Sequence, residues 1–113
     1  MDLNIQSETT DGVVVITVAG ELDLYTAPRL KENLLVALED DVLKVVVDMT
    51  GVHFIDSSAL GVLIGGVKRL KPRGGRLVLV SVDENVNWIL QITGLNSVFD
   101  IFTSREDALS NLA

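Results

Sequence analysis

The sequence has 113 residues, no cysteine and a formal net charge of −7, and 48% of its residues are hydrophobic. This length suits one compact domain with a substantial core, which we expect to span residues 1–113. The lack of cysteine excludes disulfides, thiolate metal sites and thiol catalysis, and the negative charge disfavours direct nucleic-acid binding, which needs clustered Lys and Arg.

The chain opens with the pattern of a β-hairpin. Residues 3–7 alternate between apolar and polar side chains, and residues 13–19 are apolar except for Thr17. Asp11 and Gly12 lie between these runs, and this dipeptide is a strong signal for a tight turn between antiparallel strands. The second run is almost entirely β-branched, which predicts a strand covered on both faces.

A helix follows a loop that we expect over residues 20–25. Thr26 is the expected N-cap of this helix, and Pro28 lies in its first turn. Apolar residues then recur every three or four positions as far as Leu38, which indicates an amphipathic helix. The acids at 39–41 oppose the helix dipole and are expected to end the helix.

The middle of the chain predicts a buried strand over 42–49, a linking stretch over 50–55 and a second helix. This helix begins at Asp56-Ser57-Ser58, shows an apolar stripe, and ends among the cations at 68–71. Three glycines inside it are expected to allow close packing of the helix on the sheet. They are Gly61, Gly65 and Gly66.

The remaining elements are a strand over 77–80 after a turn, a third helix that ends at Gly94, an extended piece over 98–102, and a final helix. Thr103 or Ser104 caps that last helix. Strands that alternate with helices predict an α/β fold with right-handed crossovers. We expect a mostly parallel sheet of four to five strands, an antiparallel N-terminal edge hairpin and about four helices.

Catalytic and metal chemistry find little support in the residues. His53 is the only histidine and stands alone in an apolar segment, so it is expected to be structural. Ser57 lacks the G-x-S-x-G elbow of hydrolases, and no phosphate-binding loop precedes the second helix. A receiver domain binds Mg²⁺ through acidic residues at the end of a strand. The two aspartates at 40–41 come before a strand, so they do not fit this kind of site. We therefore expect no catalytic residue, no metal and no cofactor.

The segment Asp56-Ser57-Ser58 stands out because a parallel strand leads into a helix there. Open α/β sheets present their functional surface at the carboxyl ends of such strands. Two interpretations follow from the residues alone. Ser57 caps the helix, or it is a modification or recognition site where a phosphate would meet free backbone N–H groups.

No membrane segment is expected. The longest apolar run that includes glycine covers residues 59–67, whereas a spanning helix needs roughly 20 residues. The first residues lack the basic and apolar regions of a secretory signal. We therefore expect a soluble, cytoplasmic protein.

The residues around Asp56-Ser57-Ser58 also resemble the sequence of a known family. The run DMTGVHFIDSSALGVL over 48–63 is similar to the signature of anti-sigma factor antagonists, bacterial proteins of the STAS domain family (sulfate transporter and anti-sigma antagonist). The resemblance extends to GELD at 20–23, GGRL at 74–77, ITGL at 92–95 and Val98-Phe99. It covers essentially the whole chain. Ala59 departs from the family pattern, since many members have glycine there.

The resemblance implies a partner-switching regulator that is not an enzyme. The unphosphorylated antagonist binds an anti-sigma factor, which is also a serine kinase, and so releases the sigma factor. The kinase phosphorylates the serine directly after the aspartate, which is Ser57 here, and a PP2C-type phosphatase restores the active form. The implied partner-binding residues are Glu21, Asp23, Thr26, Asp56, Ser58 and Gly61.

Two other functions remain as alternatives. The first is a STAS-like domain that senses a small molecule or scaffolds an assembly while Ser57 stays unmodified. The second is a small hydrolase or nucleotide-binding enzyme.

Overall fold

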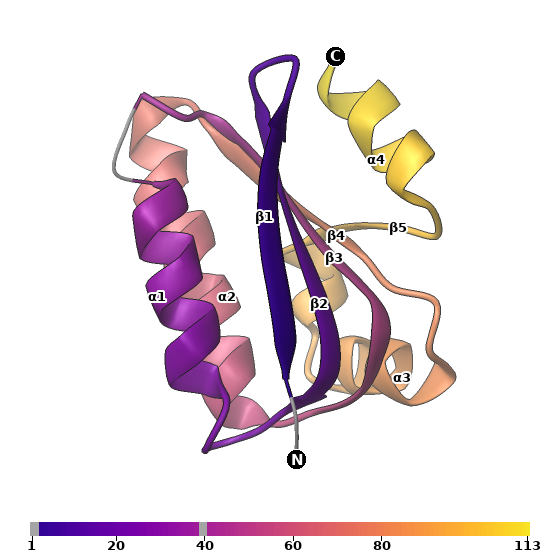
Figure 1. Cartoon of the computed structure of the whole chain (residues 1–113). Coiled ribbons are helices and arrows are strands. Elements are labelled where there is room, and N and C mark those ends of the chain that lie inside the picture. Colours follow the sequence, from indigo (N-terminus) through magenta and orange to yellow (C-terminus); the bar gives the residue numbers. More distant parts are fainter. Residues whose placement is uncertain (1–2, 39–40) are drawn as a thin grey trace.

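A twisted sheet forms the centre of the computed structural model, which describes residues 3–38 and 41–113 (Figure 1). Within these residues the sheet has the strand order β1-β2-β3-β4-β5, with β1 antiparallel to β2 and all other neighbours parallel. The strands are β1 (Asn4–Thr10), β2 (Val13–Leu22), β3 (Lys44–Ile55), β4 (Arg76–Val80) and β5 (Asp100–Phe102). The helices are α1 (Ala27–Ala37), α2 (Ser57–Leu70), α3 (Glu84–Ile92) and α4 (Arg105–Leu112), with short 3-10 turns η1 (Lys71–Arg73) and η2 (Leu95–Ser97). The predicted α/β fold is confirmed.

The N-terminal hairpin turns at the predicted dipeptide. Thr10 pairs with Val13, so that Asp11 and Gly12 alone form the loop. Their φ angles of 51° and 79° are both left-handed. A two-residue loop with positive φ at both positions matches the right-handed twist of the flanking strands, and Asp-Gly tolerates it.

Each face of the sheet has its own core. Val14, Ile16 and Val18 of β2 point into the larger core, which includes buried residues of α1, α2 and α3. Val13 and Val15 point to the opposite face, where α4 contributes Ala108 and Leu112. This alternation confirms that β2 is covered on both faces. Among the helices of the described residues, α4 alone lies on the second face.

Two segments predicted as connections are extended strand instead. β2 continues to Leu22 and β3 continues to Ile55, so the expected loop at 20–25 is shorter and the expected link at 50–55 is wrong. The two strands remain paired over this length, with register shifts near Ala19 and Gly20. At Gly51 an added Cβ would lie 2.8 Å from the Cβ of Ala19, so only glycine permits this close strand approach.

Smaller differences concern element ends and glycines. β3 begins at Lys44, and β5 is shorter than the predicted piece at 98–102. α1 ends at Ala37, while the acids Glu39 and Asp40 lie outside the described residues. The predicted close packing is confirmed at one glycine: a Cβ at Gly66 would lie 2.8 Å from Leu77 Cδ1. It is wrong for the other two, Gly61 and Gly65, because a Cβ there would meet no atom within 4 Å.

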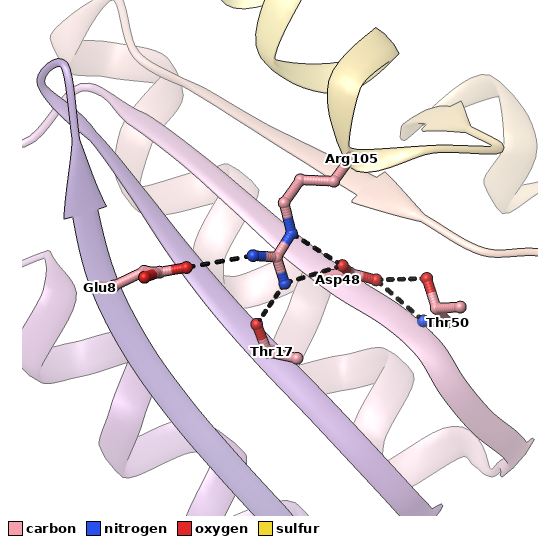
Figure 2. Close-up of polar contacts among 5 residues, drawn as sticks. All are labelled: Glu8, Thr17, Asp48, Thr50 and Arg105. Carbon is pink, nitrogen blue, oxygen red and sulfur yellow. Dashed lines mark hydrogen bonds and ion pairs between the residues drawn. The ribbon is translucent and has the colours of Figure 1, made fainter.

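An ion-pair cluster holds α4 against the sheet (Figure 2). The Arg105 guanidinium donates to Asp48 Oδ2 at 3.0 Å, to Glu8 Oε1 at 3.1 Å and to Thr17 Oγ1 at 2.6 Å. Burial of Asp48 raises its pKa, but hydrogen bonds from Thr50 and Arg105 outweigh burial and hold the pKa below its usual value. The first residue of α4 is thereby linked to β1, β2 and β3.

No helix among the described residues is both long and apolar enough to cross a bilayer.

Candidate functional site

The candidate site lies where β2 and β3 end side by side. Leu22 and Ile55 are paired at the end of the parallel ladder. Directly after β3, the backbone N–H of Asp56 donates to the carbonyl of Leu22 at 3.0 Å. The loop before α1 and the first turn of α2 therefore emerge from adjacent points on the same edge of the sheet, as expected at the carboxyl ends of parallel strands.

Asp56 is the residue that caps α2. Its Oδ1 accepts hydrogen bonds from the backbone N–H groups of Ser58 at 2.9 Å and Ala59 at 3.2 Å. The interpretation of Ser57 as the cap is therefore wrong. Ser57 is instead the first helical residue and is exposed, and its hydroxyl makes no hydrogen bond within the described part of the chain.

This cap changes the environment expected for an anion on Ser57. Free backbone N–H groups were expected there, but two of them, on Ser58 and Ala59, already donate to the Asp56 carboxylate. A negative group added to Ser57 would therefore lie beside a carboxylate, with fewer free donors than a bare helix N-terminus provides.

The polar atoms of the loop before α1 hydrogen-bond to one another. Asp23 Oδ1 accepts from the N–H of Tyr25 at 2.9 Å and the N–H of Thr26 at 3.0 Å. The Thr26 hydroxyl donates to the carbonyl of Glu21 at 2.7 Å and accepts from the N–H of Asp23 at 2.9 Å. Desolvation raises the pKa of Asp23, but the hydrogen bonds from Thr26 and Tyr25 outweigh it and lower the pKa. Asp23 therefore stays charged.

Thr26 occupies the expected N-cap position of α1 but does not cap the helix with its side chain. It precedes the first residue of α1, but its backbone is already helical and its side chain makes no capping hydrogen bond. Only 8% of Thr26 is exposed. Thr26 therefore supports the loop from inside, and Asp23 carries the polar surface.

Exposed apolar side chains surround these polar groups, and sequence reasoning missed them. Leu24 is 65% exposed and Tyr25 is 86% exposed, both in the loop before α1. Phe54, which pairs with Glu21 near the ends of β3 and β2, is 46% exposed. The sequence does contain one indication of this exposure, since Leu24 and Tyr25 are adjacent apolar residues within a predicted loop. Exposed aromatic residues beside polar groups are typical of protein interfaces.

The other predicted site residues extend along α2. Ser58 is half-buried and Gly61 is exposed, and both line a groove of about 370 Å³ between α1 and α2. Glu21 is half-buried at the end of β2. The structure therefore gathers Glu21, Asp23, Asp56 and Ser57 at the sheet edge, while Ser58 and Gly61 lead away from it.

His53 lies at the surface on β3, one residue before Phe54. Its Nδ1 lies 2.9 Å from Oδ2 of Asp83, whose Oδ1 also accepts from the N–H of Val86 at the start of α3. These hydrogen bonds, the one from His53 above all, lower the pKa of Asp83. Across residues 3–38 and 41–113, no group of three or more His, Asp or Glu side chains is placed to hold a metal ion.

Comparison with known proteins identifies similar chains along nearly the whole length. A family model described as the STAS domain matches residues 4–108. The anti-sigma-B factor antagonist of Listeria monocytogenes is 36% identical over 101 residues, which are 89% of this chain and 88% of that protein. The anti-sigma factor antagonist of Mycobacterium paratuberculosis has a crystal structure that superimposes with a TM-score of 0.90 at 28% identity, covering 97% of this chain and 93% of that one. The anti-sigma factor antagonist SpoIIAA, solved in its unphosphorylated form, gives a TM-score of 0.83 at 25% identity, with 96% of each chain covered.

Proposed function

The chain belongs to the STAS domain family, and from this premise we propose that it is an anti-sigma factor antagonist switched by phosphorylation of Ser57. Its unphosphorylated form binds an anti-sigma factor that is also a serine kinase, and this binding releases the sigma factor. Phosphorylation by that kinase abolishes binding, and a PP2C-type phosphatase restores it. The protein then acts in the cytoplasm as a single regulatory domain and catalyses no reaction itself.

The observation that carries this proposal is the exposed, unbonded hydroxyl of Ser57 in the first turn of α2. A substrate serine has to enter the active site of another enzyme, so its oxygen has to be accessible and free of intramolecular partners. The kinase supplies ATP and Mg²⁺, so Ser57 needs no neighbouring base. The solved structure of SpoIIAA is that of its unphosphorylated form, which supports a phosphorylated state for a similar chain.

The surface around Ser57 supports a protein partner. Leu24, Tyr25 and Phe54 supply exposed apolar area, while Asp23 and Asp56 hold fixed carboxylates. A phosphate on Ser57 would add about −1.5 to −2 charge at pH 7. Unmatched charge of the same sign at an interface costs several kcal/mol once it is desolvated. The switch is thus a change in surface charge.

Intact-mass spectrometry tests the proposal. The protein is incubated with Mg-ATP and, one at a time, with each purified anti-sigma factor kinase of its source organism. We expect one phosphate on the wild type and on Ser110→Ala, and none on Ser57→Ala. Ser110 is the control because it is an exposed serine on α4, which packs on the opposite face of the sheet from α2.

Two outcomes oppose the proposal. Phosphate on Ser57→Ala would move the modification elsewhere. A complete lack of phosphorylation and binding with every kinase would favour the alternative, a STAS-like sensing or scaffold domain with an unmodified Ser57.

A further inference from the structure

The groove between α1 and α2 is open where close packing was expected. Gly61 and Gly65 lie four residues apart on α2, on the same face of the helix, and both line the groove. A Cβ at either position would meet no atom within 4 Å. Glycine inside a helix is destabilising relative to alanine. Packing among the described residues therefore gives no reason for either glycine, although it does explain Gly66.

The charge of the groove is opposite to that of the molecule. Lys31 of α1 and Arg69 of α2 are the titratable side chains that line it among the described residues, and both are exposed. Neither makes an ion pair or side-chain hydrogen bond within the described part of the chain. An acidic protein of net charge −7 thus presents two cations, unpaired among the described residues, along one groove.

The cations lie toward opposite ends of the groove. α1 and α2 run side by side in the same direction, away from the edge that carries Ser57 (Figure 1). Lys31 is the first residue of α1 that lines the groove, and Arg69 is the last residue of α2 that does so. Ser58 and Arg69 are separated by about 16 Å along the axis of α2, at about 1.5 Å per residue. Leu35 and Val62 supply apolar wall between these ends.

We propose that this groove receives a helix of the anti-sigma factor kinase, a helix with an apolar stripe and an acidic side chain near each end. This inference rests on the proposed function. A volume of about 370 Å³ accommodates a few side chains from one face of a helix, as helix-in-groove recognition requires. Gly61 and Gly65 allow that helix to approach closely, and the two acids pair with Lys31 and Arg69.

The groove also continues from the site at Ser57. Ser58 lines its first end, directly after the proposed phosphorylation site. A kinase that reaches Ser57 therefore overlies this end of the groove while it engages the loop that carries Leu24 and Tyr25. Two separated contact areas on one partner give it a defined orientation, which a single exposed serine cannot give.

Charge reversal tests the proposal with a matched control. The groove variant is Lys31→Glu/Arg69→Glu, and the control is Lys68→Glu/Lys71→Glu. The control has the same change in net charge on exposed residues that do not line the groove. Affinity for the kinase that binds the wild type is measured by titration calorimetry at two salt concentrations. We expect the groove variant to bind at least about tenfold more weakly, with a smaller salt dependence, and the control to stay within about twofold.

A second variant fills the groove without a change in charge. Gly61→Ala/Gly65→Ala adds two methyl groups in open space, so we expect a folded protein with an unchanged or higher melting temperature and about fivefold weaker kinase binding. In the wild-type complex, NMR signals of the Gly61 and Gly65 amides should shift.

The outcomes separate this inference from the proposed function. Wild-type affinity in both groove variants would overturn the groove inference and leave the switch at Ser57 intact, and so would equal losses in the groove and control charge variants. Failure of every kinase to bind the wild type would overturn both. Sedimentation in which the wild type forms a dimer and the groove variants are monomers with unchanged kinase binding would assign the groove to a second copy of this chain.

Discussion

Substitutions at Asp56 and Ser57 should affect stability very differently. Asp56 accepts two backbone hydrogen bonds at the start of α2, and Ser57 accepts and donates none through its side chain. Loss of an N-cap costs about 0.5–2 kcal/mol, and its carboxylate adds about 0.3–1 kcal/mol through the helix dipole. We therefore expect Asp56→Ala to lower the free energy of unfolding by about 2 kcal/mol. Ser57→Ala should change it by less than about 0.5 kcal/mol, because alanine is the better helix former.

Urea denaturation followed by circular dichroism measures both values. Asp56→Asn is the control, because asparagine is as good an N-cap as aspartate and removes only the charge, so its loss should be clearly smaller than that of Asp56→Ala. In a melting experiment, about 2 kcal/mol corresponds to roughly 8 °C for a domain near this size. Equal destabilisation by Ser57→Ala and Asp56→Ala would show that the serine caps the helix after all, and the assignment of its hydroxyl as free would be wrong.

Three further predictions concern the switch, the ion-pair cluster and the glycines. Ser57→Asp should weaken binding to the kinase at least tenfold, about 1.4 kcal/mol, while Ser57→Ala binds like the wild type; equal affinities in calorimetry would place the interface elsewhere. Folding lowers the pKa of Asp48, so its carboxylate stabilises the protein at pH values above its unfolded pKa of about 4. This stabilisation is lost as the pH falls from about 4 through the lower pKa of the folded state. Asp48→Asn should therefore cost about 1–3 kcal/mol at pH 7 and much less at pH 3 in urea titrations, and a pH-independent loss would contradict this. Gly65→Ala should stabilise the fold by about 0.5–1 kcal/mol, whereas Gly66→Ala should be less stable than Gly65→Ala, because its Cβ would lie 2.8 Å from the Leu77 Cδ1 methyl, which then has to shift; melting curves that reverse this order would refute the packing.

The local sequence was enough to predict the helices and strands, but pairing between distant strands determines where the strands end. Asp11-Gly12 requires no tertiary information, because its backbone preference alone selects the hairpin turn. The stretch 50–55 mixes polar and apolar residues around a glycine, so it has no strand period. This stretch forms a strand because β2 runs beside it and pairs with its backbone hydrogen-bonding groups. Glycine is likewise required at position 51 because of Ala19, a spatial neighbour that lies more than thirty positions away in the chain.

The position of the candidate site was predictable, but its internal arrangement was not. The DSS run after an apolar strand located a helix start at Asp56 and Ser57, and both residue types are good caps. Backbone angles decide between them: Asp56 is extended and so directs its carboxylate at the first N–H groups of α2. The exposure of Leu24 and Tyr25 depends on how the loop before α1 closes through Asp23, which no local pattern indicates.

The arrangement of the cap bears on how the proposed switch acts. Asp23 holds the loop before α1 and Asp56 holds the start of α2, and neither network uses the hydroxyl of Ser57. A phosphate on Ser57 would therefore break no hydrogen bond that supports the fold. It would also gain little from the helix N-terminus, because the N–H groups of Ser58 and Ala59 already donate to Asp56. The added charge would lie beside the carboxylate of Asp56, on a residue that is exposed. Such a switch acts on the partner by repulsion at the surface, and it can be reversed without refolding the loop before α1 or the start of α2.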